Sequence, residues 1–451
     1  MAKDFNQLLA KIRTLTMGVT DDSRKIKKGM VFVAISGLRS DGHRFISKAR
    51  QTGVRFIVGE KGKVDYKVKN SREALSQLAA AWYGNPAQKM KVIGVTGTDG
   101  KTTTSTLIYW ILKTAGKKVG LISTVSAKID NKDYDTGFHV TNPEPIELQK
   151  FLGLMAKKGC KYVVLEVTSH GLDQHRVYGI DFDIGVLTNI THEHLNYHKT
   201  MANYVKAKAK LFNSSKVAIL NKNYLTVGEY IKTDVKRIYY DNKTLCKNLQ
   251  EVVLNKFLEP YNVLNATAAY LAIKRLKIKD EDFVRGIHTF PGVEGRMQEI
   301  SNKRGIRVII DFAHTPNALR NVLMALRGQV SADRRLIVVF GCAGERDIQK
   351  RPMMAEVSTN LADISIFTSE DPRNESIQNI FAQMYRGIKK DAATYKIPDR
   401  GEAINFSINK LAKIGDIVVI CGKGHEKSMN FNGIEYPWSD KKSVISALRN
   451  E

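Results

Sequence analysis

Short apolar segments alternate with stretches of helical pattern along most of this chain, and this alternation constrains the fold more than any other feature. Expected helices include residues 104–115, which end before Gly116, and 318–326, which follow a Thr315–Pro316 start. Strands that alternate with helices form mostly parallel sheets covered by helices, so the sequence predicts an α/β protein. From residue 89 onward the expected strands are 91–95, 162–166, 184–189, 217–220, 308–312, 336–340, 363–367 and 416–421.

The length of 451 residues corresponds to about three domains of roughly 150 residues each. Residues 1–88, with expected strands at 30–35 and 55–58, form a small N-terminal α/β domain. Residues 89–292 form a central domain with a phosphate-binding loop (P-loop) and a mostly parallel sheet. After a break at Phe290-Pro-Gly292, residues 293–451 form a C-terminal, Rossmann-like α/β domain.

The charge balance is strongly basic, since 71 Lys and Arg residues against 45 Asp and Glu residues leave a net charge of +26. Such a surplus is typical of a protein with a polyanionic partner, or of a lysine-rich surface. The second interpretation is favoured, because the lysines are spread over the whole chain and no long basic block stands out.

Cysteine spacing and hydropathy indicate the compartment. The cysteines lie far apart without a C-x-x-C pair, which argues against a disulfide framework or a Cys-rich zinc site. No apolar run reaches the ~18 residues of a membrane-spanning helix, and residues 1–16 lack the apolar core of a signal peptide. We therefore expect a cytoplasmic protein without a membrane span. The cysteines are Cys160, Cys246, Cys342 and Cys421.

The segment Gly94-Val-Thr-Gly-Thr-Asp-Gly-Lys-Thr-Thr-Thr104 follows an expected strand and precedes an expected helix. This is the context of a phosphate-binding loop, in which glycines allow backbone N–H groups to surround phosphate oxygens. Lys101 adds a positive charge, and Thr102 offers a hydroxyl to Mg²⁺. The strict G-x-x-x-x-G-K-[ST] pattern has Gly where Val95 stands. The segment nevertheless predicts binding of a nucleoside triphosphate.

Polar residues follow many expected strands at their C-terminal ends, where ligands of open α/β sheets bind. Glu166 ends the strand at 162–166 and offers carboxylate oxygens, which Mg²⁺ prefers. In the third block, any one polar strand end is explained equally well by a capped turn. Together they predict a concave polar rim, because parallel strands end at one edge of a sheet. These ends are Asp311-Phe-Ala-His-Thr-Pro316, Gly341-Cys-Ala-Gly-Glu-Arg-Asp347, Thr368-Ser-Glu-Asp-Pro-Arg373 and Gly422-Lys-Gly-His-Glu426.

Two neighbouring segments of the central block are ambiguous. His192, His194 and His198 suggest zinc, but their spacing does not match H-E-x-x-H. The helical stretch 204–212 carries a lysine at every second position, Lys206, Lys208 and Lys210. From composition alone, these lysines are expected to form a solvated basic face.

In this order and spacing, the segments resemble the Mur ligases, and among them the tripeptide synthetases of peptidoglycan synthesis, the MurE type. The resemblance covers nearly the whole chain. Its first part, Asp22-Ser-Arg-Lys-Ile-Lys-Lys-Gly29 and Asp41-Gly-His-Arg-Phe45, looks like the family's UDP-substrate domain. Its other parts are the P-loop, Thr141-Asn-Pro143, Glu166-Val-Thr-Ser-His170, Gln174-His-Arg176, Glu193–His194, Asn262, Asn265, Gly295-Arg-Met-Gln298, Asp311-Phe-Ala-His-Thr-Pro316 and Gly422-Lys-Gly-His-Glu426.

The resemblance implies an ATP-dependent amide ligase that acts in cell wall biogenesis, and thereby in cell shape and cell division. ATP would phosphorylate the D-Glu side-chain carboxylate of UDP-MurNAc-L-Ala-D-Glu. The amine of a diamino acid would then attack the acyl phosphate and expel phosphate. Because one anion attacks another, Mg²⁺ and cationic side chains must neutralise their repulsion.

The resemblance also implies roles for individual residues. Two Mg²⁺ ions are expected, one on the P-loop at Thr102 and the second on Glu166, His194 and a carbamylated Lys208. Carbamylation requires a neutral amine, so the surroundings of Lys208 must lower its pKa. The nucleotide would meet Gly97, Thr98, Asp99, Gly100, Lys101, Thr102, Thr103, Asn265, Arg296 and Asp311. The implied catalytic residues are Lys101, Lys208, His194, Arg296 and His314, and UDP-MurNAc-dipeptide would meet Ser23, Thr141, Asn142, Thr168, Gln174 and Arg176.

The third block is expected to bind the incoming amino acid through Arg346, Asp371, Arg373, Gly422 and Glu426. The family's meso-diaminopimelate enzymes carry Asp-Asn-Pro-Arg where this chain has Glu-Asp-Pro-Arg. Arg373 would grip the distal carboxylate in a bidentate pair, which favours meso-diaminopimelate. Asp371 would also suit a plain ammonium, so L-lysine stays open. Asp99, where Asn is usual, brings negative charge close to the phosphates and is expected to weaken nucleotide affinity.

Three other interpretations are disfavoured. A folylpolyglutamate or cyanophycin-type ligase would share the P-loop domain, but it leaves the first 88 residues unexplained. A nucleic-acid-binding P-loop ATPase would account for the charge of +26, but no basic stripe interleaved with aromatic residues is present. A catalytically dead homologue would not need Lys101, Glu166, His194 and Lys208. We expect a monomer whose partners are small molecules and not nucleic acid.

Overall fold

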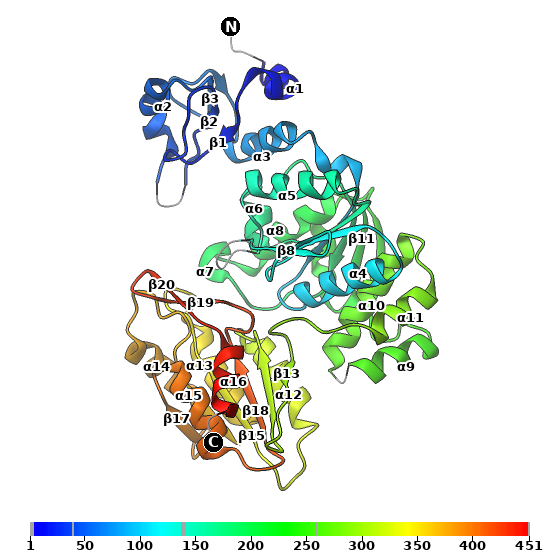
Figure 1. Ribbon diagram of the computed structural model, residues 1–451, viewed down its shortest axis with the longest axis vertical. Helices are drawn as coiled ribbons and strands as arrows, with labels where there is room; N and C mark the ends of the chain where they lie inside the picture. Colours follow the sequence, from blue (N-terminus) through cyan, green and yellow to red (C-terminus); the bar gives the residue numbers. More distant parts are fainter. Residues whose placement is uncertain (1–3, 38–39, 137–140, 258, 450–451) are drawn as a thin grey trace.

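A computed structural model describes residues 4–37, 40–136, 141–257 and 259–449 of the chain. The described residues form an elongated molecule in which an N-terminal, a central and a C-terminal unit follow one another along the long axis (Figure 1). Each unit has its own sheet.

The N-terminal unit is built on a parallel sheet in the order β1-β2-β3-β4. Successive side chains of a strand point to opposite faces. Val31 and Val33 therefore pack under α1 and α3, whereas Phe32 packs on the other face with Ile46 of α2. The elements are α1 (Phe5–Leu15), β1 (Val19–Thr20), β2 (Val31–Val33), α2 (Ile46–Thr52), β3 (Phe56–Gly59), β4 (Tyr66–Lys67) and α3 (Ser71–Trp82).

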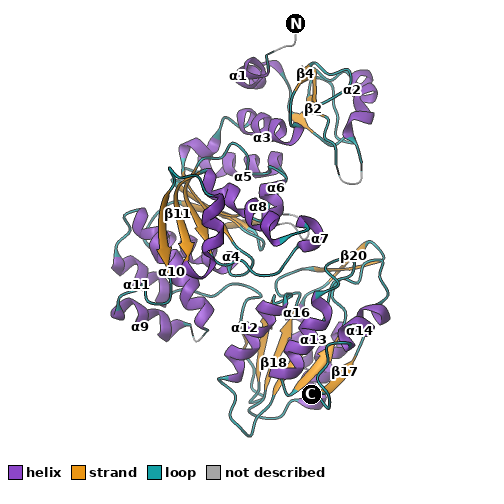
Figure 2. Cartoon of the chain, turned by 180° about the vertical axis from the view of Figure 1, so that it is seen from behind, coloured by secondary structure: helices purple, strands orange, loops and turns teal. Residues whose placement is uncertain are grey.

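The central unit has a sheet in the order β12-β11-β10-β5-β9-β6-β7-β8, parallel from β12 to β6 and antiparallel at β7 and β8. Helices α5 and α8 cover one face, and α4, α10 and α11 cover the other (Figure 2). The strands are β5 (Lys91–Thr96), β6 (Val119–Ile122), β7 (Ala127–Ile129), β8 (Lys132–Tyr134), β9 (Tyr162–Glu166), β10 (Phe182–Leu187), β11 (Ser215–Asn221) and β12 (Lys236–Tyr240). The helices are α4 (Lys101–Thr114), α5 (Pro145–Lys157), α6 (Ser169–Asp173), α7 (Leu195–His198), α8 (Met201–Asn213), α9 (Lys247–Lys256), α10 (Pro260–Arg275) and α11 (Asp280–His288).

The C-terminal unit has a sheet in the order β13-β14-β18-β15-β16-β17, parallel except for β13 at its edge. Helices α12, α13 and α14 cover one face, and α15 and α16 cover the other. The strands are β13 (Gln298–Ile300), β14 (Arg307–Asp311), β15 (Leu336–Phe340), β16 (Ile364–Phe367), β17 (Ala393–Lys396), β18 (Ile417–Cys421) and the hairpin β19 (Ser428–Phe431) and β20 (Ile434–Pro437). The helices are α12 (Pro316–Arg327), α13 (Lys350–Leu361), α14 (Ile377–Tyr385), α15 (Arg400–Phe406) and α16 (Asp440–Arg449).

The predicted α/β class with mostly parallel sheets is confirmed. The expected strand at 184–189 lies two residues too late, because β10 ends at Leu187 and Asn189 serves the P-loop instead. The expected helix at 104–115 begins earlier, at Lys101, immediately after Gly100. The predicted domain limits, after residues 88 and 292, fall between the sheets and remain predictions.

Two further observations concern cysteines and membranes. All the cysteines lie in the described part of the chain and are free thiols. Among the residues that the structure describes, no helix combines the length and apolar character needed to span a bilayer.

Candidate active site

A cleft of about 880 Å³ lies between the central and the C-terminal units. The strand ends of both sheets contribute to it, β5 and β9 from one side and β14, β16 and β18 from the other. Most of the predicted site residues line this cleft: Thr98, Asp99, Gly100, Lys101, Thr102, Thr103, Thr141, Glu166, Thr168, His194, Asn265, Arg296, Asp311, His314, Arg346, Asp371, Arg373, Gly422 and Glu426. Others are not among its lining residues: Ser23, Gly97, Asn142, Gln174, Arg176 and Lys208.

The P-loop connects β5 to α4 and requires its glycines. A Cβ atom at Gly97 would lie 1.8 Å from Thr188 Oγ1. Gly100 has φ +77°, and a Cβ atom there would lie 2.4 Å from Asn265 Oδ1. The Lys101 ammonium donates to Thr98 O at 2.7 Å, and burial lowers the pKa of Lys101. Glycine is therefore required at positions 97 and 100, because Thr188 and Asn265 leave no room for a side chain there.

Glu166 holds the hydroxyls around the start of α4. It is 1% exposed, and its Oε1 accepts from Thr102 Oγ1 at 3.1 Å and from Thr124 Oγ1 at 2.9 Å. Arg296, from the segment that leads into the C-terminal unit, donates to Thr102 Oγ1 at 3.3 Å. A carboxylate, hydroxyls and a guanidinium thus converge where a metal–phosphate group would bind.

Lys208 is the buried lysine of the stretch 204–212, which is expected from composition to be solvated. By contrast, Lys206 is exposed and Lys210 pairs with Asp173. Its ammonium donates to Gly97 O at 2.7 Å and lies 4.4 Å from the centre of the Tyr204 ring. Burial, followed by the nearby charge of Lys101, holds the pKa of Lys208 well below its ordinary value. A neutral amine, which carbamylation needs, is therefore favoured at this position.

His194 lies beside Lys208 and shares its electrostatics. Its backbone has φ +58°, and its ring centre is 4.6 Å from that of His170. Burial, followed by His170 and Lys208, holds the pKa of His194 well below its ordinary value, so the ring is neutral near pH 7 and can donate a lone pair to a metal.

The donor set favours Mg²⁺ over zinc. Within the described ranges, no group of at least three His, Cys, Asp or Glu side chains is placed to bind one ion, so the histidines at 192–198 gain no support as a zinc site. Glu166 and Thr102 offer oxygen, and Glu193 Oε2 is buried with no hydrogen-bond partner among the described residues. Oxygen ligands and phosphate are what Mg²⁺ prefers.

Besides the Arg296–Thr102 hydrogen bond, further polar contacts cross the cleft between the two units. Asn317 donates to Asp99 Oδ2 at 2.9 Å, Lys350 Nζ lies 3.7 Å from Glu193 Oε1, and His192 Nε2 lies 3.4 Å from Asp347 Oδ2. The C-terminal unit therefore contacts the P-loop and the segment after β10 directly.

The start of the C-terminal sheet adds groups on the nucleotide side. Buried Asp311 accepts from Met297 N at 2.7 Å and from Ala313 N at 2.8 Å, and burial raises the pKa of its carboxyl. The guanidinium of Arg296 stacks 4.2 Å from the Phe312 ring centre. His314 Nδ1 lies 2.9 Å from Phe312 O, and since a carbonyl oxygen only accepts, this nitrogen carries the proton. Burial lowers the pKa of His314 to about 3, so its ring is neutral.

Residues predicted for the UDP substrate form a chain leading away from the cleft. Thr141 Oγ1 lies 2.9 Å from Thr124 Oγ1, and Asn142 Oδ1 accepts from Thr168 N at 2.8 Å. Arg176 donates to Asn142 O at 2.7 Å and to Gln174 Oε1 at 2.9 Å. Ser23 belongs to the N-terminal unit, between β1 and β2.

The opposite end of the cleft carries the residues predicted for the amino acid. Arg373 donates to Gly344 O at 3.2 Å, while Asp371 accepts from the ammonium of Lys423 at 2.8 Å. Oε2 of Glu370 is buried without a hydrogen bond to any described residue, and a Cβ atom at Gly422 would lie 2.4 Å from it. Burial raises the pKa of Glu370 to about 8.

No role in the site is expected from the sequence for several residues that the structure places in or beside the cleft. Asn189 Oδ1 accepts from Thr98 N at 3.1 Å and from Asp99 N at 2.8 Å, and so shapes the P-loop from the neighbouring strand. Its place at a strand end was the available signal. Lys350 is a basic residue among many, so only its tertiary surroundings distinguish it. Lys423 lies in the segment Gly422-Lys-Gly-His-Glu426 that the sequence marks, but its burial between two carboxylates is visible only in the structure.

Family models match three parts of the chain: "Mur ligase family, catalytic domain" at residues 16–83, "Mur ligase middle domain" at 95–264, and "Mur ligase, glutamate ligase domain" at 295–424. The chain belongs to the Mur ligase family. The expected membership is thereby confirmed, and with it the expectation of an ATP-dependent ligase.

Relatives in this family are similar over nearly the whole chain. A protein of Bacteroides thetaiotaomicron named UDP-N-acetylmuramoyl-L-alanyl-D-glutamate–2,6-diaminopimelate ligase is 37% identical over 96% of this chain and 95% of its own length. A solved structure with the same name is 31% identical, with a TM-score of 0.63 over 96% of this chain and 94% of its own. A folylpolyglutamate synthase of Mycobacterium tuberculosis shares the fold at 16% identity and a TM-score of 0.64, but covers 78% of this chain and 92% of its own.

Proposed function

We propose that this Mur ligase joins meso-diaminopimelate to UDP-MurNAc-L-Ala-D-Glu in peptidoglycan synthesis, with ATP as the phosphoryl donor. The observation that carries the proposal is the single cleft that joins P-loop, Glu166, Arg296 and, at its far end, Arg373. Relatives named for this activity support it. A folylpolyglutamate-type ligase is disfavoured, because that relative covers 78% of the chain against 96% for the diaminopimelate ligase.

The first step requires a carboxylate to attack the terminal phosphate of ATP. Lys101 and Arg296 supply positive charge on the phosphate side, and the loop N–H groups orient the triphosphate. Bound Mg²⁺ would supply further charge neutralisation, and Thr102, Glu166, His194 and Lys208 are the residues proposed to hold two such ions. Carbamylation of Lys208 would give it the oxygen ligands that this requires.

The second step requires the amine of the incoming amino acid to reach the acyl phosphate. Arg346 and Arg373 line the end of the cleft where a distal carboxylate would bind. A guanidinium pairs with a carboxylate through two parallel hydrogen bonds, which fixes the far end of the molecule and aims its amine along the cleft. An amino acid that ends in a plain ammonium lacks this contact, which favours meso-diaminopimelate over L-lysine.

The test is phosphate release in the presence of ATP and Mg²⁺, with either amino acid supplied together with UDP-MurNAc-dipeptide or with a dihydropteroate substrate. Turnover is expected only with UDP-MurNAc-dipeptide, and faster with meso-diaminopimelate than with L-lysine. Turnover that depends only on the pteroate substrate would contradict the substrate assignment. Size-exclusion chromatography and mass spectrometry of a Lys208 peptide test the monomeric state and the carbamate, and a cytoplasmic location is proposed from the family.

A further inference from the structure

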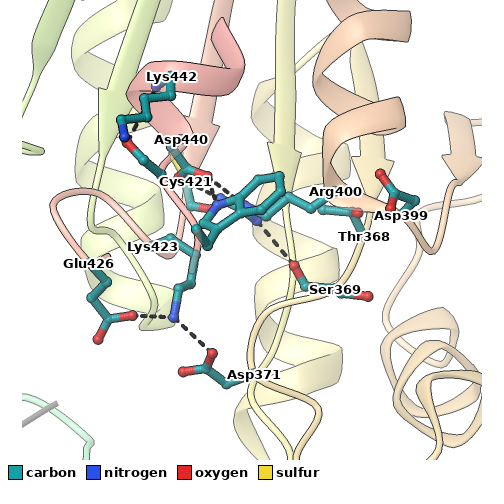
Figure 3. A network of polar contacts seen from close by, with 12 residues as sticks. Thr368, Ser369, Asp371, Asp399, Arg400, Cys421, Lys423, Glu426, Asp440 and Lys442 are labelled. Carbon is teal, nitrogen blue, oxygen red and sulfur yellow. Dashed lines mark hydrogen bonds and ion pairs between the residues drawn. The ribbon is translucent and has the colours of Figure 1, made fainter. Parts of the chain in front are cut away.

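A buried lysine lies next to the end of the cleft that is predicted to bind the amino acid. Lys423, which follows β18, has a side chain that is 0% exposed. Its ammonium lies between two carboxylates, 2.8 Å from Asp371 Oδ1 and 2.5 Å from Glu426 Oε2 (Figure 3). Burial alone would lower the pKa of Lys423, but Glu426 and Asp371 raise it above its ordinary value, so the side chain stays charged. Both carboxylates belong to residues that line the cleft, whereas Lys423 itself does not.

A second buried ion pair fixes the strand ends that carry these groups. Arg400 and Asp440 are both fully buried and paired at 2.7 Å. The guanidinium of Arg400 also donates to Ser369 O, just after β16, at 3.3 Å and to Cys421 O, at the end of β18, at 2.9 Å (Figure 3). Arg400 therefore holds the first residues of the two loops that carry Asp371 and Lys423.

The loop that carries Asp371 is held in an uncommon conformation. Asp371 has φ +42° and Arg373 has φ +55°, values that residues other than Gly rarely adopt. The hairpin β19–β20 holds the loop in place, because Asn430 N donates to Asp371 Oδ1 at 3.0 Å, Arg373 N donates to Asn430 O at 3.0 Å, and Asn432 N donates to Arg373 O at 2.8 Å. Such a conformation persists only where its surroundings determine it, and it turns Asp371 toward Lys423 and Arg373 toward the cleft.

We propose that Lys423 is a specificity-determining residue, which occupies from inside the protein the ammonium position that Asp371 and Glu426 create. This inference rests on the proposed function. With that position filled, Asp371, Glu426 and Lys423 together keep one net negative charge, and the two positive charges of Arg346 and Arg373 at the same end of the cleft exceed it. A distal carboxylate is attracted there, whereas the ε-ammonium of L-lysine meets two arginine cations and carboxylates that Lys423 already pairs. Lys423 thus resolves the ambiguity that an acidic residue at position 371 creates.

The experiment compares kcat/KM for meso-diaminopimelate and for L-lysine in wild type, Lys423→Met and Lys423→Arg. In Lys423→Met the two carboxylates lose their counter-charge, so they repel the distal carboxylate and attract an ammonium. The ratio of kcat/KM for meso-diaminopimelate to kcat/KM for L-lysine is expected to fall about tenfold or more. This change should come through KM for the amino acid, with KM for ATP unchanged, and Lys423→Arg should keep most of the wild-type ratio. Lys427→Met is the matched control, because it removes an exposed lysine from the same segment between β18 and β19.

Removing the charge of Asp371 gives a second, independent test of the same electrostatics. Adding Asp371→Asn to Lys423→Met removes one of the uncompensated carboxylates and should return the ratio part of the way toward wild type. Asp371→Asn alone should raise the preference for meso-diaminopimelate, and it decides the matter if Lys423→Met does not fold in thermal melts. An unchanged ratio in folded Lys423→Met, or in Asp371→Asn, would overturn the inference. Absence of dipeptide-dependent turnover in wild type would instead contradict the proposed function.

Discussion

Replacing Asp99 by Asn is expected to strengthen ATP binding. Asp99 lies in the P-loop and lines the cleft, so its carboxylate faces the region where the triphosphate would bind. The backbone of the loop does not depend on this charge, since Thr188 Oγ1 donates to Asp99 O at 2.6 Å and Asn189 Nδ2 at 3.1 Å. Asn at position 99 retains an oxygen acceptor for Asn317, so the contact across the cleft survives the substitution.

The magnitude follows from Coulomb's law. At a separation of about 7 Å and an effective dielectric constant of about 20, two unit charges interact by about 2 kcal/mol. Asp99 is partly exposed, and solvent, salt and Mg²⁺ all reduce its repulsion of the phosphates. We expect a net gain of about 1 kcal/mol, which corresponds to about a fivefold lower Kd.

The assay is calorimetric titration of a non-hydrolysable ATP analogue with Mg²⁺ at two salt concentrations. The advantage of Asp99→Asn over wild type should shrink at higher salt, because screening weakens the charge that the substitution removes. Asn317→Ala is the control, since it removes the contact across the cleft without changing the charge of the loop. Unchanged or weaker binding in a folded Asp99→Asn protein would refute the electrostatic reasoning.

Three further substitutions test other parts of the site. Lys208→Ala should abolish amino-acid-dependent phosphate release, and a short carboxylate such as acetate should restore part of it. Asp440→Asn leaves the buried Arg400 without its counter-charge and should lower the free energy of unfolding by about 3–5 kcal/mol in guanidinium titrations. Burial raises the pKa of Glu370 from 4.5 to about 8. Between these pH values the unfolded chain loses the Glu370 proton while the folded protein keeps it, so the free energy of unfolding falls as the pH rises. Glu370→Gln should therefore gain Tm over wild type as pH rises through this range, with the difference constant above it.

The sequence predicts the buried strands well and the exposed ones poorly. The strand at 336–340 coincides with β15, and every residue of β15 and β18 is buried, so each forms a continuous apolar run. By contrast β17 lies at the sheet edge with mostly exposed residues, and its composition does not distinguish it from a loop. A strand that is buried on both faces can be recognised in the sequence, because nearly all of its residues are apolar.

Site residues follow a similar division. The P-loop is predictable, because its glycines and Lys101 must be adjacent along the chain to surround a phosphate. The role of Lys350 is not, because it depends on the approach of α13 to Glu193 across the cleft. The burial of Lys208 is likewise decided by packing against Gly97, since the lysines on either side of it in the sequence are exposed or only partly buried.

The contacts across the cleft explain how one arrangement serves two steps of chemistry. Asp99–Asn317 and Glu193–Lys350 join side chains that also line the cleft, so the groups that connect the two units lie where the substrates would bind. The Asp99–Asn317 pair is only partly buried, so water competes for both partners and the pair contributes little stability. A bound triphosphate adds negative charge between the two units, toward which Lys350 of one unit and Lys101 of the other are both attracted. We therefore expect charge brought by the substrate to strengthen the contact between the two units, and Arg373 lines the same cleft, where it would orient the amine toward the phosphorylated carboxylate.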